Sequence, residues 1–216
     1  MTNRISITKL FQSAFVLSVD DERYAFDFGS ETPGEMATAI RPVKATFVSH
    51  VHPDHFDIPN LRRLDAPVYS PPDVANALKQ EPVRVSIIRP GDCASLAALS
   101  VHAFWVDHGP GVSAPIDNLG FKIEADRRSV LFLGDIGAVM PTPEGVFTVV
   151  MIPVGGSKVF SAAQAADFIN RLGHKGITIP MHYHGRADRR AAEEFRALAS
   201  SFCDVHVCQV GESVDL

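Results

Sequence analysis

Apolar and polar residues alternate along the first part of the chain, the pattern of strands that bury one face. A turn signal, Asp20-Asp21, stands between the second and third alternating runs. A short acidic turn between two such runs predicts a β-hairpin. The three runs are RISITKLF (4–11), AFVLSV (14–19) and RYAFDFG (23–29).

Helical spacing and end signals predict three helices, at residues 70–80, 161–173 and 188–202. For the first, we expect Ser70 to be the N-cap and Pro71 the first helical residue. The second has Ser161 in the N-cap position and Gly173 as its stop. The third is amphipathic.

Further apolar runs predict strands in the rest of the chain. Early strands come with few helices, whereas the later part reads strand, helix, strand, helix, strand. This order predicts a layered α/β domain with two sheets and helices on their outer faces. With 216 residues, 46% of them hydrophobic, we expect one domain over residues 1–216. The runs lie at 44–50, 83–88, 99–106, 118–125, 129–135, 148–154, 176–180 and 204–210.

Charge and cysteine content narrow the classes of partner. A formal net charge of −5 argues against nucleic acid or a membrane surface as the partner, since either would call for a basic surface. We find no signal-peptide pattern and no apolar window long enough to span a membrane. The odd number of cysteines and the lack of CxxC spacing indicate buried, reduced thiols and a cytoplasmic location. The cysteines are Cys93, Cys203 and Cys208.

The segment TFVSHVHPDHFD, residues 46–57, concentrates potential metal ligands. His50, His52, Asp54 and His55 lie within six positions, and these histidines are three of the nine in the chain. Residues two apart at a strand end point to the same side, so His50 and His52 can reach one cation. After the turn, Asp54 and His55 can face a neighbouring point. Imidazole and carboxylate ligands suit zinc, with manganese or iron as alternatives.

Three later residues are candidates for the rest of such a site. His108, Asp135 and His182 each follow an apolar, strand-like run. A buried acid or histidine at a strand end needs a partner, because its burial alone is costly. A single histidine at a strand end is more often structural, and we interpret His102 and His206 in that way. His174 is expected to face solvent at a helix end.

The chain resembles the metallo-β-lactamase superfamily. SHVHPDHFD (49–57) matches the HxHxDH signature of that superfamily, and His108, Asp135 and His182 follow in the order of its remaining ligands. The segment from Pro153 to Tyr183 is similar to the small UlaG-like branch, which includes a lactonase acting on a phosphorylated ascorbate.

This resemblance implies a four-layer αββα sandwich with two divalent metal ions at one edge. The first metal ion would be held by His50, His52 and His108, the second by Asp54, His55 and His182, and Asp135 would bridge them. The chain departs from many members in two places: Ile136 follows the GD pair where they carry Thr, and His184-Gly185 follows Tyr183. These departures leave the ligand set intact and weaken the transfer of a substrate.

Two neighbouring metal ions can lower the pKa of a water molecule and polarise a substrate oxygen. Asp54 is then the candidate to orient that water or accept its proton. Asp27 is either a residue that holds a ligand imidazole or a plain turn residue before Gly29. For substrate contacts we select Lys158, Tyr183 and His184, with a solvated lysine and a surface histidine as the simpler alternatives.

The resulting function is a metal-dependent hydrolase of a small, anionic ester, lactone or phosphodiester. The alternatives are an RNA or DNA phosphodiesterase of the same fold and a non-catalytic metal-binding protein. The acidic balance and short chain argue against the nuclease, and the complete ligand set argues against the non-catalytic protein. A glyoxalase II-like thioesterase would need an added helical region, and a secreted β-lactamase a signal peptide. The sequence leaves open whether the protein forms a homo-oligomer.

Overall fold

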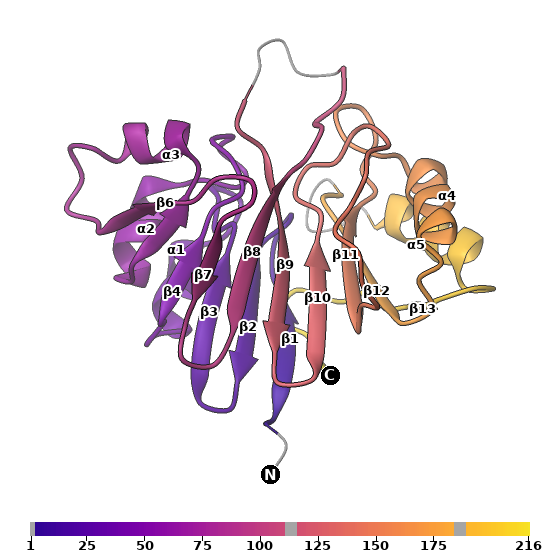
Figure 1. The fold of residues 1–216 in the computed structure, drawn as a ribbon, viewed down its shortest axis with the longest axis horizontal. Coiled ribbons are helices and arrows are strands. Elements are labelled where there is room, and N and C mark those ends of the chain that lie inside the picture. Colours follow the sequence, from indigo (N-terminus) through magenta and orange to yellow (C-terminus); the bar gives the residue numbers. More distant parts are fainter. Residues whose placement is uncertain (1–2, 111–115, 184–188) are drawn as a thin grey trace.

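In a computed structural model, which describes residues 3–110, 116–183 and 189–216, two β-sheets face each other (Figure 1). Each described sheet has seven strands. In order across the first sheet, the strands are β14 (Ser213–Asp215), β1 (Ile5–Lys9), β2 (Phe15–Val19), β3 (Glu22–Phe26), β4 (Ala45–Phe47), β5 (Val68–Ser70) and β6 (Val85–Ile87). In order across the second, they are β13 (Asp204–Val205), β12 (Ile177–Met181), β11 (Val149–Pro153), β10 (Arg128–Phe132), β9 (Leu119–Ala125), β8 (Ser100–Trp105) and β7 (Cys93–Ser95).

Both sheets combine antiparallel and parallel pairing. In the first, β1, β2 and β3 form an antiparallel meander, and the predicted hairpin is confirmed by the register that pairs Val19 with Glu22. Strands β3 to β6 are parallel, as are β10 to β13 in the second sheet. Because parallel strands end at the same edge of a sheet, the loops that follow them gather there.

Five described helices cover the outer faces and make the sandwich four layers deep (Figure 1). Apolar side chains fill three spaces: between the two sheets, beneath α1 to α3, and beneath α4 and α5. The central space contains stacked aromatic rings, among them Phe15 on Phe26. The predicted fold class is therefore confirmed. The helices are α1 (Gly34–Ala39), α2 (Ile58–Leu64), α3 (Pro72–Ala77), α4 (Ala162–Leu172) and α5 (Arg190–Ala199).

Local sequence signals explain where the longest helix begins and ends. At the start of α4, Ser161 and Gln164 form a reciprocal capping box, and Gly173 ends the helix at φ 67°. Both ends agree with the sequence prediction. At α3, the predicted cap is wrong. Ser70 is the last residue of β5 and Pro71 occupies the N-cap without a side-chain cap, because pairing of Ser70 with Ile87 keeps that residue in the sheet.

Other sequence predictions also need correction. The strand predicted over 204–210 is limited to Asp204–Val205. Cys203 and Cys208 are buried free thiols as expected, whereas Cys93 is exposed because it lies on the edge strand β7. His174 is buried rather than solvent-facing, and its Nε2 lies 3.0 Å from the Ile177 carbonyl oxygen. Within the described residues, no helix is long and apolar enough to span a membrane.

Candidate metal centre

The HxHxDH segment follows β4 directly and is fixed by a close backbone approach. A Cβ atom at Gly29 would lie 2.0 Å from the carbonyl carbon of Asp54, so the two loops can touch only because residue 29 has no side chain. The nitrogen of Ser30 also donates to the Pro53 carbonyl, at 2.7 Å. These contacts hold the turn that carries Asp54 and His55 against the loop after β3.

The three later candidates arrive from the second sheet. His108 lies in the loop after β8, Asp135 after β10, and His182 directly after β12. All three are buried, as are His50 and His55. His182 has a left-handed backbone (φ 53°), and a Cβ atom on Gly155 would lie 2.1 Å from its carbonyl oxygen. A glycine at position 155 therefore lets the β11 loop pack against the backbone of His182.

The structure brings the seven side chains together as two adjoining groups, each able to hold a metal ion. The groups share Asp135, and within each group one potential ligand atom per residue lies within 4.8 Å of all the others. Asp135 Oδ2 lies 3.3 Å from His108 Nε2 and 3.2 Å from His182 Nε2, while its Oδ1 lies 3.0 Å from His55 Nε2. The first group is His50, His52, His108 and Asp135; the second is Asp54, His55, Asp135 and His182.

Hydrogen bonds behind the imidazoles turn their Nε2 atoms toward the centre. Asp27 accepts from the Ser49 hydroxyl at 2.6 Å and from His55 Nδ1 at 2.7 Å. Since the Ser49 proton goes to Asp27, the hydroxyl oxygen accepts from His50 Nδ1, at 2.9 Å. His108 Nδ1 donates to a backbone carbonyl, that of Lys158, at 3.1 Å. Contacts of this kind are typical of ligating histidines.

Ser49 is the residue in this network that the sequence did not single out. It directly precedes the first histidine of the motif and contacts both Asp27 and His50. Its backbone nitrogen also donates to Asp27 Oδ1, at 2.7 Å. In the sequence, the only pointer to Ser49 was its position near the end of the predicted strand, directly before the HxHxDH motif.

Burial and nearby charges shift the pKa values of the groups in the centre in different directions. Burial lowers the pKa of His50 well below its ordinary value, and also lowers that of His52. Burial acts the same way at His182, but Asp135 and Asp54 outweigh it and raise the pKa to about 9. At Asp135, burial favours the neutral acid, yet nearby His55 and His182 hold its pKa well below the usual range.

The donor atoms fit a cation. His55 Nε2, His108 Nε2 and Asp135 Oδ1 are all buried, and within the described structure none has a partner in hydrogen-bond geometry. Buried polar atoms without partners are costly, and these three converge on one region. A divalent cation would satisfy them, and nitrogen and oxygen donors suit zinc, manganese or iron.

A cavity of about 280 Å³ opens over the two groups. On one side it is lined by His52, Asp54, His108, Asp135 and His182, and on the other by the loop Gly156 to Lys158. Lys158, a predicted substrate contact, thus lies at the same cavity as the metal-binding groups. Ser157 in this loop has φ 63°, which turns the chain sharply between β11 and α4.

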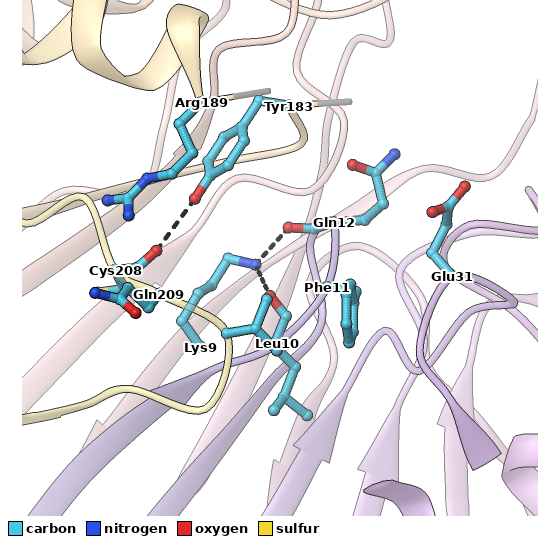
Figure 2. A pocket seen from close by; sticks show the side chains of 10 residues that line it. Lys9, Leu10, Phe11, Gln12, Glu31, Tyr183, Arg189, Cys208 and Gln209 are labelled. Carbon is cyan, nitrogen blue, oxygen red and sulfur yellow. Dashed lines mark hydrogen bonds between the residues drawn. The ribbon is translucent and has the colours of Figure 1, made fainter. Parts of the chain in front are cut away.

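The remaining sequence candidates lie elsewhere. Tyr183 was expected to line the same cleft, but its side chain points into a second cavity and its hydroxyl donates to the Cys208 carbonyl at 3.4 Å (Figure 2). Both residues lie beyond the end of β12, and the left-handed backbone of His182 turns the chain between them. His184 lies outside the described residues. His102 and His206 contact Glu124 and Asp204 at the surface, far from the motif in sequence and outside both groups.

Comparisons with known proteins agree with this geometry. A family model described as a beta-lactamase superfamily domain matches residues 25–183. The chain belongs to the metallo-β-lactamase superfamily. Among curated members, a UPF0173 protein of Pyrococcus furiosus is 32% identical over 162 residues, which cover 73% of this chain and 74% of that protein. A UPF0173 metal-dependent hydrolase of Thermococcus kodakarensis is 25% identical over 199 residues, covering 85% of this chain and 88% of that protein.

Solved structures show that this superfamily member also has the fold of its relatives. Igni18, a metallo hydrolase from the archaeon Ignicoccus hospitalis, superposes with a TM-score of 0.83, covering 99% of this chain and 98% of that chain at 23% identity. At this identity the likeness concerns the fold. Family membership and the named relatives place the protein in the class of metal-dependent hydrolases.

Proposed function

We propose that this superfamily member is a single-domain hydrolase that uses two divalent metal ions, zinc foremost, to hydrolyse a small anionic ester, lactone or phosphodiester with water. The observation that carries the proposal is the pair of adjoining groups that share Asp135. One carboxylate within reach of three imidazole Nε2 atoms is the arrangement that a two-metal centre needs. The residues from Pro153 to Tyr183 support membership of the UlaG-like branch.

In this proposal each group holds one ion. His50, His52 and His108 would hold the first ion, Asp54, His55 and His182 would hold the second, and Asp135, which belongs to both groups, would contribute to both. Bound there, the ions would polarise the substrate oxygen and lower the pKa of a water molecule. The support is the burial of the imidazoles and the orientation of three Nε2 atoms toward the shared carboxylate.

Asp54 is the residue that we assign to the attacking water. Both Asp54 and Asp135 line the cavity, but Asp54 is partly exposed whereas Asp135 is buried, so Asp54 is the more accessible of the two carboxylates. Burial acts to raise the pKa of Asp54, but the hydrogen bond from His182 and the nearby charges of His55 and His182 together lower it below its ordinary value. As a carboxylate, Asp54 orients the water and accepts its proton. Asp27 positions His55 by accepting from its Nδ1.

The loop from Gly156 to Lys158 supports an anionic substrate. Its lysine and the backbone nitrogens of Ser157 and Lys158 are donors beside the cavity, and neither nitrogen donates to any residue in the described structure. Unpaired backbone N–H groups and an ammonium together form a site for a carboxylate or phosphate. The cavity volume of about 280 Å³ limits the substrate to a small molecule.

A screen of the purified protein tests the proposal. The protein is stripped with a chelator, reloaded with zinc or manganese, and assayed on an aryl ester, a lactone, a thioester and bis(4-nitrophenyl) phosphate, with bound metal quantified in parallel. We expect about two metal equivalents, and turnover of at least one compound that is lost on stripping and restored on reloading.

Two outcomes would contradict the proposal in different ways. Tight binding of metal without turnover of any of the four classes would favour a non-catalytic metal-binding protein. Turnover with one metal equivalent would retain the hydrolase and exclude the two-metal assignment. The exposed His102, replaced by Ala, serves as the control for histidine loss outside the centre.

A further inference from the structure

A second cavity, of about 300 Å³, lies beside the metal centre (Figure 2). Among the described residues it shares no lining side chain with the metal-centre cavity, and the two meet at the adjacent residues His182 and Tyr183. Its described lining residues are Lys9 to Gln12, Glu31, Tyr183, Arg189 and Cys208 to Val210. The proposed hydrolase reaction uses none of these side chains.

One end of this cavity carries two cationic side chains. Lys9 is buried at the end of β1, and its Nζ donates to the Leu10 carbonyl at 2.6 Å and to the Gln12 carbonyl at 2.5 Å. An ammonium has three protons, so one remains for another acceptor. Arg189 donates from Nη2 to the Val207 carbonyl and lies 3.9 Å from Glu193, while its Nε is buried and has no hydrogen-bond partner in the described structure.

The other end offers acceptors. The Gln12 side-chain oxygen is buried and likewise lacks a partner among the described residues, and the exposed carboxylate of Glu31 lies on the same side (Figure 2). Figure 2 shows these two side chains on the other side of Tyr183 from Arg189. Leu10, Phe11 and Val210 supply apolar lining.

We propose that this second cavity binds a small zwitterion, with its carboxylate at Arg189 and Lys9 and its ammonium group at Gln12 and Glu31. An unpaired buried donor and an unpaired buried acceptor in one cavity are each costly, and a single ligand with a group for each satisfies both. A short hydrocarbon spacer matches the apolar lining, as in small-molecule sites that place a few polar groups on an apolar wall.

The second cavity is connected to the metal centre through one backbone bond. The His182 nitrogen donates to the Gln12 carbonyl oxygen at 3.3 Å, and the same oxygen accepts from Lys9. A ligand at Gln12 therefore contacts the segment that fixes a residue of the metal centre. The proposed binding site does not depend on the hydrolase reaction, because it requires no metal ion and no turnover.

Titration of the zinc-loaded protein with four probes tests this site. The zwitterions 4-aminobutyrate and 6-aminohexanoate are compared with pentanoate and pentylamine, which carry one charge each, in ¹H–¹⁵N spectra. We expect the better zwitterion to bind about tenfold or more tightly than either single-charge probe, because each end gains a charge-assisted hydrogen bond. The shifts should centre on the backbone amides of Leu10, Gln209 and Val210, which line the cavity.

Two variants separate the two ends. Arg189→Met should weaken the zwitterion and pentanoate by about tenfold and leave pentylamine unchanged, while Gln12→Met should weaken the zwitterion and pentylamine and leave pentanoate unchanged. Arg171→Met is the matched control, since Arg171 is exposed on α4 and pairs with Asp167. Thermal unfolding of each variant shows that the fold is retained.

Three results would overturn the proposal: no probe binds; all four bind equally in wild type and both variants; or the shifts centre on Asp54 and Lys158, which would assign the probes to the metal-centre cavity instead.

Discussion

Lys9 and His182 are buried basic residues that donate to the same carbonyl oxygen, that of Gln12, the lysine from Nζ and the histidine from its backbone nitrogen. At both, burial acts to lower the pKa. The pKa of Lys9 falls to about 7, whereas Asp135 and Asp54 raise that of His182 to about 9. The difference lies in the partners, because Lys9 contacts carbonyl dipoles and His182 contacts two carboxylates.

The contrast shows that buried charge is neutralised differently in the two cavities. In the metal centre, the positive charge on His182 is offset by Asp135 and Asp54 within the same group, so this residue can be buried without an outside ion pair. In the second cavity, the buried ammonium has no carboxylate partner in the described structure, and desolvation dominates. A carboxylate-bearing ligand would supply the charge that this cavity lacks.

The largest expected effect comes from removing the shared carboxylate of the metal centre. Asp135→Ala should lose both metal equivalents and lower hydrolysis by about 10³-fold or more, since polarisation by a bound metal contributes several kcal/mol. In the metal-free variant, the pKa of His182, followed by NMR, should be lower than in metal-free wild type, because Asp54 is then its only remaining carboxylate partner of the two. His52→Ala is the comparison, and it should lose one equivalent. Two equivalents retained by Asp135→Ala would show that the assignment is wrong.

Replacement of Lys9 by Met tests the contrast at the second cavity, where the buried ammonium has no carboxylate partner in the described structure. Between the folded pKa of about 7 and the ordinary value of 10.5, the unfolded chain binds more protons, so the Lys9 contribution to stability rises with pH. The unfolding free energy of wild type minus that of Lys9→Met should therefore increase from pH 7 to 10, by on the order of 4 kcal/mol. Urea unfolding at several pH values measures it, with the exposed Lys79→Met as control. A difference independent of pH would contradict burial of Lys9 without a carboxylate.

A smaller effect is expected for Asp27, whose carboxylate accepts a hydrogen bond from His55 Nδ1. Asp27→Asn weakens the hydrogen bond to His55 Nδ1 and should lower metal affinity by about tenfold to 100-fold, measured by competition with a chelator. Asp126→Asn is a matched control, because both residues have φ 50° and Asp126 is exposed. Equal metal affinities of the two variants would mean that Asp27 acts only as a turn residue.

The smallest effect concerns the cationic group beside the metal-centre cavity. Lys158→Met should reduce kcat/KM about tenfold for an anionic aryl ester and far less for a neutral one, because one charge-assisted hydrogen bond is lost. The exposed Lys175→Met controls for the change in net charge. Equal losses on both esters would remove the proposed role of Lys158.

The sequence singles out the residues that the structure gathers into the two groups because they form a dense motif followed by strand-end residues. The spacing of the ligand candidates within 50–55 is visible in one short segment. The ends of parallel strands lie at the same edge of a sheet, so contacts between strand-end residues far apart in sequence could be inferred. The α4 helix was predictable for a similar reason, since its cap and stop are encoded within one segment. The helix α2 has comparable signals in its sequence, Asp57 as N-cap and Pro59 in the first turn, although it was not among the predicted helices.

The second cavity could not be predicted in this way. Its lining residues, from Lys9 to Val210, come from distant segments with no common spacing, and they meet because the two sheets pack face to face. Tyr183 illustrates the limit: its neighbour His182 lies in the cluster as expected, but the direction of Tyr183 depends on the left-handed backbone of His182, which packs against Gly155. Tertiary packing decides such directions.

The three apolar spaces have a consequence for the way the chain assembles. The space beneath α1 to α3 is filled by residues of the first half of the chain, the space beneath α4 and α5 by residues of the second half, and the central space by both. Each metal-binding group likewise draws ligands from both halves. Ions that bind only the docked halves would stabilise them by mass action. Loading of the centre and docking of the two halves would then be one linked equilibrium.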